Sequence, residues 1–351
     1  MIQLAIKKIV DGAPLTRDEI EGTVREIAEG RATQAQMGGF LVALGRKGET
    51  TEEIALFAST LREYSVRIDP KVSGRLVDTC GTGGDRAKTF NVSTVAALVA
   101  AGAGASVAKH GNRSVTSSCG SADVLERLGF NMDASPAAVK DSIERFGIGF
   151  MFAPTFHPAM RYVAPVRREL GVKTVFNLMG PLINPAGAST QLVGVYSPDL
   201  VERVAVVLRM LGCEEALVVH AREGMDEIST SGKTLAAWLK EGEIETLELS
   251  PSDFGVGEMG TQVRGVGGAE EAAGAVVSIL GGDGRMAPLI DMVLLNSAAA
   301  LVVAGRADDF PGGVELARKS LASGAALTKL KRLVEGSGGD VSRIETHAAS
   351  R

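Results

Sequence analysis

The sequence changes its pattern near residue 70, and this change limits the folds that the chain can adopt. Before that point apolar residues recur only at the spacing of an α-helix, in residues 4–10, 20–27, 40–44 and 54–61. Thr16 with Glu19 and Thr50 with Glu53 match the S/T-x-x-E capping box that begins a helix. From Arg75 onward short apolar runs alternate with helical stretches, which predicts an α/β layer.

The pattern predicts an α/β protein with two parts. We expect a small N-terminal helical domain over residues 1–70 and a larger α/β domain over residues 71–164 and 187–335, built on a mainly parallel central sheet. The segment 165–186 interrupts the α/β pattern with helix-like, turn-rich sequence, and we expect it to pack back on the helical domain. Residues 336–351 are polar and rich in glycine, which predicts a flexible tail.

Two stretches of the larger domain have a more specific pattern. Within residues 226–249, two strand-like runs flank Lys240-Glu241-Gly242-Glu243 and predict an edge hairpin. Residues 89–108 carry no charge over 20 positions, a length that could span a membrane. Glycines and polar residues break this stretch, so we interpret it as a loop, a buried helix and a buried strand, with no contact to a membrane.

Composition argues against several functional classes. Lys plus Arg number 37 and Asp plus Glu 42, which gives a net charge of −5, and aromatic residues are only 4% of the chain. A face suited to nucleic acid is therefore not expected. Cys80, Cys119 and Cys213 lie far apart, which argues against a zinc ribbon or a disulfide scaffold. Together with an N-terminus that lacks the apolar run of a signal peptide, this cysteine usage predicts a cytoplasmic protein.

The first candidate ligand-binding loop is DTCGTGGD, residues 78–85, directly after a short apolar strand. Three glycines in four positions allow the backbone to approach a ligand closely and to present amides to an oxyanion. Residues 91–94, Asn-Val-Ser-Thr, precede a helix, whose free N–H groups favour phosphate. A tight β-to-α turn with capping residues is the structural alternative. Known nucleotide fingerprints do not fit, because Arg86 replaces the third glycine of G-x-G-x-x-G and a Walker motif is absent.

The second candidate is KHGNRS, residues 109–114, which continues through Ser117 and Ser118 to residues 120–123. Its cationic side chains lie in a loop rich in glycine and serine after a predicted buried strand. Ligands of open α/β sheets bind outside the carboxyl ends of the strands, so this loop predicts an anionic ligand. Solvated surface cations are the alternative.

The third candidate is the turn GMDEIS, residues 224–229, with adjacent carboxylates on Asp226 and Glu227. Carboxylate oxygens, completed by waters and substrate phosphates, suit Mg²⁺. The alternative is an exposed acidic turn. A His/Cys metal site is not predicted, since no two of the four histidines are close in sequence, and we interpret His220 and His347 as structural.

The fourth candidate is a pair of arginines, Arg167 and Arg168, in a helical stretch that follows His157. Adjacent helical residues point in different directions, so at most one of the two faces a given site. Such an arginine could hold a carboxylate through forked hydrogen bonds. The alternative is a surface ion pair with Glu169 or Glu144.

Together these strings resemble the anthranilate phosphoribosyltransferases, enzymes of tryptophan biosynthesis. The matching strings are DTCGTGGD, FNVST, KHGNRS, GSADVLE, HPAM, APVRRELG, FNLMGPLINPA and GMDEIS, and the likeness extends to about residue 335. The resemblance implies an active site in the hinge cleft between the two domains and a homodimer formed through the helical domain. It also makes an anthranilate synthase subunit a candidate partner.

The resemblance implies transfer of the phosphoribosyl group from 5-phosphoribosyl 1-pyrophosphate (PRPP) to the amine of anthranilate, with Mg²⁺, as two ions. It implies PRPP contacts from Gly81, Gly84, Asp85, Thr89, Asn91, Val92, Ser93, Thr94, Lys109, His110, Gly111, Asn112, Arg113, Ser114, Val115, Thr116, Ser117 and Ser121. It implies anthranilate contacts from Gly81, His110, Asn112, His157 and Arg167, and Mg²⁺ ligands at Ser93, Asp226 and Glu227. The catalytic residues it implies are Lys109, Asn112 and Arg167.

This chain departs from the family pattern in one place. Many members have Lys-Ser where this chain has Ser118-Cys119, so one charge of the phosphate loop is missing unless Arg113 compensates for it. Two other functions are alternatives to phosphoribosyl transfer. A nucleoside phosphorylase of the same architecture would carry a KxSGRG type of loop in place of KHGNRS. A non-catalytic relative that binds nucleic acid would need a basic face, which a net charge of −5 does not favour.

Overall fold

The computed structural model describes residues 1–84, 90–114, 119–257 and 267–349, and its N-terminal region consists of four helices. These are α1 (Ile2–Val10), α2 (Arg17–Ala28), α3 (Gln34–Lys47) and α4 (Thr51–Glu63). The capping boxes predicted at Thr16 and Thr50 are confirmed, and a third begins α3 at Thr33 with Gln36. The threonine hydroxyl and the Glu or Gln side chain each accept a backbone N–H that the helix leaves unpaired.

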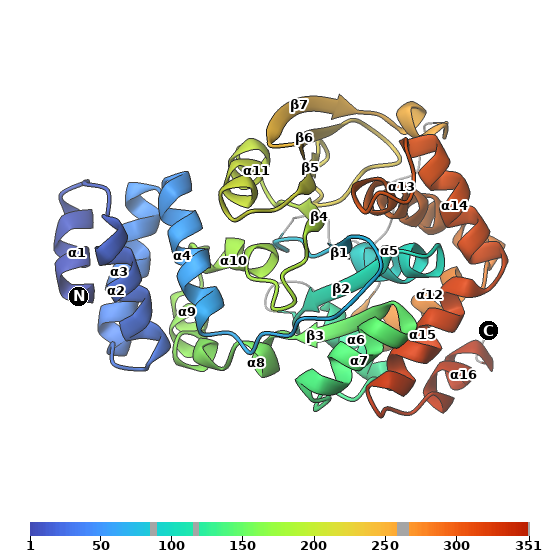
Figure 1. Cartoon of the computed structure of the whole chain (residues 1–351), viewed down its shortest axis with the longest axis horizontal. Coiled ribbons are helices and arrows are strands. Elements are labelled where there is room, and N and C mark those ends of the chain that lie inside the picture. The colour runs from blue at the N-terminus through green and yellow to red at the C-terminus, as the bar shows by residue number, and fades with distance from the viewer. Residues whose placement is uncertain (85–89, 115–118, 258–266, 350–351) are drawn as a thin grey trace.

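A seven-stranded sheet forms the centre of the larger part, in the order β3-β2-β1-β4-β5-β6-β7 (Figure 1). The strands are β1 (Leu76–Asp78), β2 (Ser106–Gly111), β3 (Ile148–Phe152), β4 (Thr190–Gly194), β5 (Glu215–Ala221), β6 (Thr234–Lys240) and β7 (Glu243–Leu249). The pairings among β1 to β5 are parallel, whereas β6 and β7 are antiparallel. The predicted edge hairpin is confirmed, and its loop residues Glu241 and Gly242 both have positive φ, 52° and 81°, as a type I′ turn requires.

Both faces of the sheet are covered, because successive strand residues pack into two different cores. Leu192 and Leu217 belong to one hydrophobic cluster, and their neighbours Val193 and Val218 belong to the other. The first cluster holds the helices on one side, α5 (Val92–Gly102), α6 (Ser121–Arg127), α7 (Pro136–Phe146), α12 (Gly268–Leu280), α13 (Ala287–Val303), α14 (Phe310–Ala322) and α15 (Ala325–Gly336). The short helices α8 (Ala153–Phe156), η1 (Pro158–Tyr162), η2 (Pro251–Phe254) and η3 (Gly284–Met286) complete the connections.

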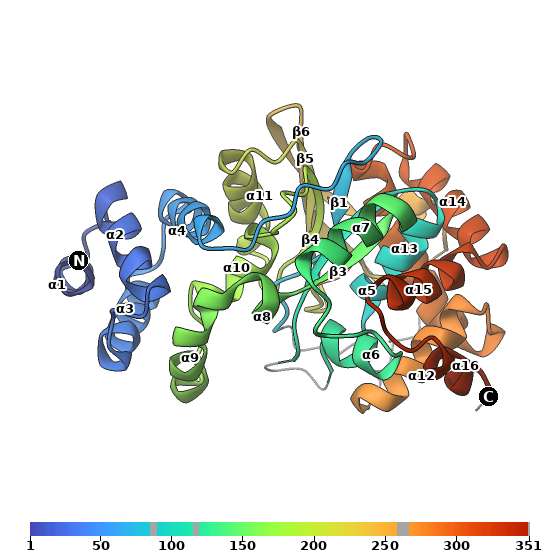
Figure 2. The same cartoon turned by 60° about the horizontal axis from the view of Figure 1, so that its bottom comes forward.

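The second cluster joins the sheet to the N-terminal helices through α9 (Ala164–Leu170), α10 (Phe176–Leu182) and α11 (Leu200–Met210). These three helices lie between the N-terminal helices and the sheet (Figure 2). The ring of Phe57 on α4 meets that of Phe176 edge to face, at 5.2 Å between centroids. Arg62, also on α4, donates from Nε to the carbonyl oxygen of Leu182 (2.8 Å), and burial lowers the pKa of its guanidinium. Segment 165–186 therefore packs on the helical part.

Among the described residues one helical stretch, Gly284–Val303, has the length and composition of a membrane span. Of that window, 67% is buried inside the protein, and α13 packs against α5 and α14. We therefore interpret it as a core helix. The stretch 89–108 forms α5 and the start of β2, as predicted from residue 92 onward, and residues 85–89 lie outside the described part.

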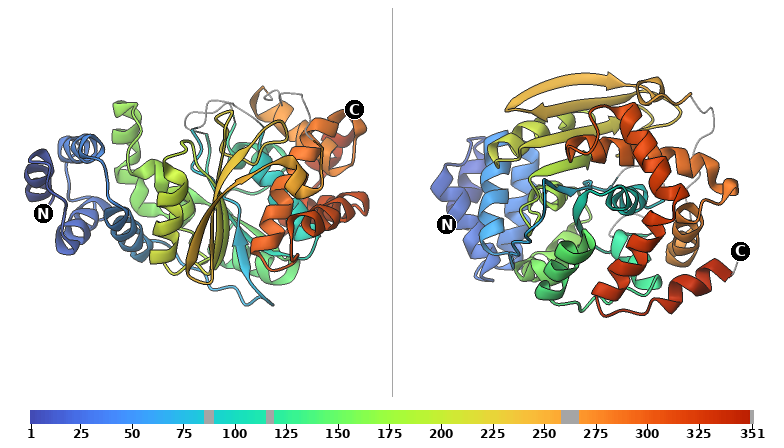
Figure 3. Two further views of the ribbon diagram at one scale, coloured as in Figure 1. Left: turned by 90° about the horizontal axis from the view of Figure 1, so that it is seen from above. Right: turned by 45° about the vertical axis from the view of Figure 1, so that its right-hand side comes forward.

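The C-terminal segment differs from the prediction of a flexible tail over residues 336–351. Residues Ser342–Ala349 form α16 near the C-terminus (Figure 3), and this helix packs on α12. Its residue Ile344 is only 1% exposed. The segment is also tied back to the domain, since the N–H of Asp340 donates to the carbonyl oxygen of Gly129 (2.9 Å). Val341 and Ile344 are the only large apolar residues in this polar stretch, and two such residues gave too weak a periodicity to predict the helix.

Glu53 fixes the helical part and gives a test of it. Only 4% exposed, its carboxylate accepts N–H groups of Leu15 and Thr50 (2.9 Å each) and the ammonium of Lys47 (2.7 Å). Substitution Glu53→Ala leaves these donors unpaired and should lower the free energy of unfolding by about 3 kcal/mol in urea denaturation. Glu52→Ala, one residue away and exposed, is the control and should change it little. Equal effects of the two substitutions would contradict this role of Glu53.

Candidate active site

A buried carboxylate organises the carboxyl ends of β1 and β2. Asp78, which is 0% exposed, accepts the N–H of His110 (3.2 Å) and a side-chain N–H of Asn184 (2.7 Å). The Asn184 amide also donates to the carbonyl oxygen of Ala108 (2.9 Å). Burial raises the pKa of Asp78, while the nearby Lys109 opposes that shift. These contacts fix the end of β2, where the loop that carries the KHGNRS string (the basic loop) begins.

Lys109 places a buried ammonium group where three segments meet. Its side chain is 4% exposed, and Nζ donates to the carbonyl oxygen and hydroxyl of Thr79 (3.3 Å each) and to the hydroxyl of Ser93 (3.4 Å). Thr79 follows β1, and Ser93 lies in the first turn of α5. All three contacts are long and neutral, so they compensate a buried charge only in part. An anion bound beside the N-terminus of α5 would complete the compensation.

The glycine-rich loop is held against the next strand, β4. The N–H of Thr82 donates to the carbonyl oxygen of Gly194 (2.8 Å), and Lys173 donates to the carbonyl oxygen of Gly84 (3.1 Å). A Cβ atom at Gly81 would lie 3.1 Å from the Gly194 oxygen and 3.3 Å from Oδ2 of Asp226. Glycine at position 81 thus permits the close approach of the loop to the acidic turn. The predicted site residues Asp85 and Thr89 lie outside the described residues.

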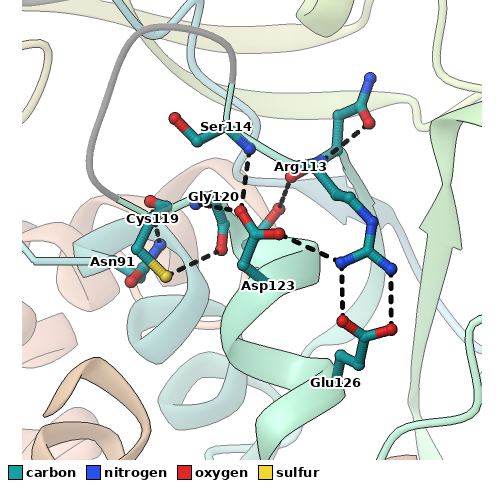
Figure 4. A network of polar contacts seen from close by, with 9 residues as sticks. Asn91, Arg113, Ser114, Cys119, Gly120, Asp123 and Glu126 are labelled. Atoms are coloured by element: carbon teal, nitrogen blue, oxygen red, sulfur yellow. Dashed lines mark hydrogen bonds and ion pairs between the residues drawn. The ribbon is translucent and has the colours of Figure 1, made fainter. Parts of the chain in front are cut away.

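The loop after β2 is closed by a network of carboxylates (Figure 4). Asp123 accepts N–H groups of Ser114 (3.0 Å) and Gly120 (2.9 Å). Arg113 is forked onto Glu126 (2.6 and 2.7 Å) and also donates to Asp123 (3.2 Å), and these bonds raise the pKa of Arg113. In this arrangement Arg113 binds two carboxylates, so its predicted contact with PRPP and its compensation of the missing loop charge stay predictions.

Other predicted residues of the anion site gather around the same loop. The carbonyl oxygen of Asn112 accepts the hydroxyl of Ser121 (3.4 Å), and Asn91 donates to the carbonyl oxygen of Cys119 (3.2 Å). A Cβ at Gly111 would lie 2.2 Å from the Ser121 hydroxyl, so the strand end needs glycine there. The buried hydroxyl of Thr94 has no hydrogen-bond partner among the described residues.

Four further residues were predicted to contact PRPP. One of them is a core residue, and the other three lie outside the described part of the chain. Val92 is 0% exposed, and its side chain packs into the hydrophobic core. Only its backbone could therefore face a ligand. Val115, Thr116 and Ser117 lie outside the described residues.

His110 and His157 pack together as neutral rings. Their ring centroids are 5.0 Å apart in a T-shaped arrangement, and Nδ1 of His110 is 2.9 Å from the carbonyl oxygen of Gly180. Burial lowers the pKa of His157 to about 3 and also lowers that of His110. Within the described part of the chain, Nε2 of each ring is buried without a hydrogen-bond partner. The pair is therefore a buried, uncharged aromatic cluster in which two ring nitrogens lack a described hydrogen-bond partner.

The structure distinguishes the two adjacent arginines. Arg167 is half-buried with its guanidinium 5.5 Å from the ring centre of Phe176, and burial lowers its pKa, whereas Arg168 is exposed. Phe176 lies one helical turn before Gly180 on α10, and Gly180 contacts His110. Arg167 therefore faces the same helix as the histidine pair. Within the part of the chain that the structure describes, neither arginine forms an ion pair with Glu169 or Glu144, and Glu144 instead lies 3.8 Å from Lys140.

The acidic turn borders the glycine loop. Asp226 and Glu227 are half-buried, which differs from the alternative of an exposed turn, and Asp226 lies against Gly81. Ser93 is linked to the same loop, because its carbonyl oxygen accepts the hydroxyl of Thr79 (2.9 Å). Among the described residues no group of three or more His, Cys, Asp or Glu side chains could hold a metal. Two carboxylates and a hydroxyl fit Mg²⁺ that completes its shell with water and substrate phosphates.

Three residues that position the site cannot be identified from local sequence. Asp78 and Asn184 lie within strings that resemble the family, but their contact spans 106 positions and has no local signal. Lys173, which holds the glycine loop, also lies 3.4 Å from the ring centre of Tyr196. The sequence around Lys173 does not distinguish a lysine that contacts the protein from one whose ammonium group lies in solvent.

Comparisons with known proteins agree with this architecture. Residues 73–327 match the family model described as "Glycosyl transferase family, a/b domain", and residues 3–65 match "Glycosyl transferase family, helical bundle domain". An anthranilate phosphoribosyltransferase of Methanocorpusculum labreanum is 49% identical over 97% of this chain and 99% of its own length.

Solved structures give the same relationship. The crystal structure of anthranilate phosphoribosyltransferase from Thermus thermophilus has a TM-score of 0.88 at 42% identity, covering 95% of this chain and 99% of that one. The Saccharomyces cerevisiae enzyme in complex with PRPP and Mg has a TM-score of 0.88 at 29% identity, covering 96% and 98%. The same yeast enzyme in complex with 4-fluoroanthranilate has a TM-score of 0.86 at 28% identity, covering 96% and 97%. By its sequence and its fold, this chain belongs to the anthranilate phosphoribosyltransferase family.

Proposed function

We propose that this protein transfers the phosphoribosyl group of PRPP to the amine of anthranilate and releases pyrophosphate, as a step of tryptophan biosynthesis. The observation that carries the proposal is the buried ammonium of Lys109 beside the N-terminus of α5, where its described partners are neutral oxygens. A buried cation at a helix N-terminus suits a multiply charged anion. The yeast relative in complex with PRPP and Mg supports this assignment.

The protein groups would act mainly on the leaving pyrophosphate. Displacement at C1′ of the ribose through an oxocarbenium-like transition state develops negative charge on that group. Lys109 and the amides of the glycine loop would stabilise this charge. Asp226, Glu227 and Ser93 would hold Mg²⁺, for which we propose two ions, and the metal would supply further neutralisation of the phosphates. A contact of Arg113 with PRPP would require it to leave Glu126.

Anthranilate would bind between the glycine loop and α9. Arg167 would hold its carboxylate, and Asn112 and Gly81 would contact the ring and amine. Supporting this placement, burial keeps His110 and His157 uncharged, so they can line an aromatic substrate. The aromatic amine is already neutral at pH 7, so the mechanism assigns no general base. Orientation of the amine at C1′ would supply the remaining rate enhancement.

We further propose a homodimer formed through the helical domain. Leu4 on α1 and Val42 on α3 are large apolar side chains that are 55% and 49% exposed, which supports burial against a second copy. A cytoplasmic location and an anthranilate synthase subunit as partner complete the proposal. They rest on the cysteine usage and the family resemblance.

The activity itself can be tested by the fluorescence of anthranilate. Mixing the purified protein with anthranilate, PRPP and Mg²⁺ should cause a loss of fluorescence that EDTA prevents, because the amine becomes substituted. No loss of fluorescence from folded protein would contradict the proposal. Phosphorolysis of a nucleoside by the same preparation would then favour the phosphorylase alternative.

Substitution of Arg167 tests the anthranilate site. Arg167→Ala removes a charge-assisted contact worth about 1.5–3 kcal/mol, so the KM for anthranilate should rise roughly 10- to 100-fold while that for PRPP changes little. Arg168→Ala is the matched control, because the same charge is removed from an exposed neighbour. If Arg168→Ala raised this KM and Arg167→Ala did not, the carboxylate contact would belong to Arg168.

Substitution of the acidic turn tests the metal site. Asp226→Asn combined with Glu227→Gln should shift the Mg²⁺ concentration for half-maximal activity upward by at least about tenfold, since two anionic oxygen ligands are lost. Glu243→Gln with Glu245→Gln makes the same change of charge on the exposed strand β7 and should leave the titration unchanged. A normal Mg²⁺ titration of the first variant would refute the assignment.

A further inference from the structure

The core helix α13 carries one buried amide whose contacts reach the acidic turn. Asn296 lies in the middle of this helix and is 0% exposed, and the other buried residues of α13 are apolar except Ser297. A buried amide in such a helix needs partners for its donor and acceptor atoms. Asn296 finds most of them outside its own helix.

Those partners are the two backbone groups of a single residue, Ile228. The N–H of Ile228 donates to Oδ1 of Asn296 (3.0 Å), and Nδ2 of Asn296 donates to the carbonyl oxygen of Ile228 (3.1 Å). The same nitrogen also donates to the carbonyl oxygen of Met292 within the helix (2.9 Å), which fixes the orientation of the amide. This two-point contact holds one peptide unit on each side of Ile228, directly after Glu227.

The turn is held from its other side as well. The carbonyl oxygen of Met225 accepts the N–H of Ala221 at the end of β5 (2.9 Å). The backbone of Asp226 rests on Gly194, where a Cβ atom would lie 1.6 Å from the Asp226 carbonyl oxygen. Asp226 and Glu227 are thus the two residues between a strand end and a clamp from the helical core, and their side chains project from a backbone fixed at both ends.

We propose that Asn296 is a positioning residue for the metal-binding carboxylates: its amide clamps Ile228 and thereby sets where the carboxylates of Asp226 and Glu227 lie. The proposal rests on the proposed function of the acidic turn and deepens it. Mg²⁺ demands near-ideal octahedral geometry at short distances, so a small displacement of either carboxylate weakens its binding. Groups that orient metal ligands typically change metal affinity 10- to 100-fold when they are removed.

The test measures Mn²⁺ binding directly, because Mn²⁺ accepts the same oxygen ligands and its free form gives an electron paramagnetic resonance signal. Asn296→Leu keeps the branched shape and the number of heavy atoms of the side chain, though in a larger volume, and removes both hydrogen bonds to Ile228. In the presence of PRPP we expect its Mn²⁺ affinity to fall at least about tenfold, toward that of the Asp226→Asn, Glu227→Gln variant. A mixture of PRPP and Mn²⁺ without protein gives the background.

A control separates positioning from loss of stability. Leu301→Ala removes a fully buried side chain from the same helix and leaves the hydrogen bonds between Asn296 and Ile228 in place. It should lower Tm at least as much as Asn296→Leu and leave Mn²⁺ affinity within twofold of the wild type. If Leu301→Ala reduced the affinity as much as Asn296→Leu, the effect would be general loosening of the core and the proposal would be overturned.

A second variant covers the case in which Asn296→Leu does not fold. Asn296→Ala removes both hydrogen bonds to Ile228 without adding bulk or charge to the core, so we expect the same fall in Mn²⁺ affinity. Wild-type affinity in a folded Asn296 variant would overturn the proposal. Absence of Mn²⁺ binding by the wild-type protein with PRPP would instead overturn the metal site itself, and with it the basis of this inference.

Discussion

The arrangement of the site depends on one buried carboxylate, that of Asp78. A carboxylate removed from water is stable only where donors and positive charge replace its hydration. Here the donors are the backbone of His110 and the amide of Asn184, which belong to β2 and to the segment after α10. Satisfying this group therefore fixes three segments relative to one another. The ammonium of Lys109 is positioned as a result, since it lies on the strand that Asp78 holds.

The two cations of the basic loop have opposite surroundings. Lys109 is buried among neutral oxygens at distances of 3.3 to 3.4 Å, whereas Arg113 is exposed and forked onto a carboxylate at 2.6 and 2.7 Å. Asp78 is near enough to interact with the charge of Lys109, but the hydrogen bonds of the ammonium within the described part of the chain go to neutral oxygens, so it can still pair with an incoming anion. The second is already neutralised, and its bonds order the loop. From the sequence alone, both residues are predicted to bind the same anionic ligand.

Sequence patterns over a few residues predicted those parts of the fold that depend on contacts between residues close in the chain, such as helix caps and a hairpin turn. The capping boxes at Thr16 and Thr50 gave the starts of α2 and α4, and Lys240-Glu241-Gly242-Glu243 gave the edge hairpin. The motifs also identified Lys109, Ser93 and Asp226, which the fold brings to neighbouring segments. Contacts between distant positions were beyond prediction, because nothing near Asp78 or Asn184 in sequence indicates that they meet. The pairing of Arg113 and the helix α16 were missed for the same reason, since each depends on packing against another element.

The second hydrophobic cluster extends from Ile2 to Leu239, and this has a consequence for the order in which the protein can be completed. The helix α4 is synthesised early, yet strands β5 and β6, which share its core, end at residues 221 and 240. At about 5–20 residues per second, the ribosome needs roughly 10–30 s to make the intervening chain. During that time the apolar face of α4 lacks α10 and α11, which cover it in the finished fold and themselves rest on the sheet. The nascent chain thus carries an uncovered apolar surface that binding to a chaperone, or early contact with a second chain, would shield until these helices and the sheet are made.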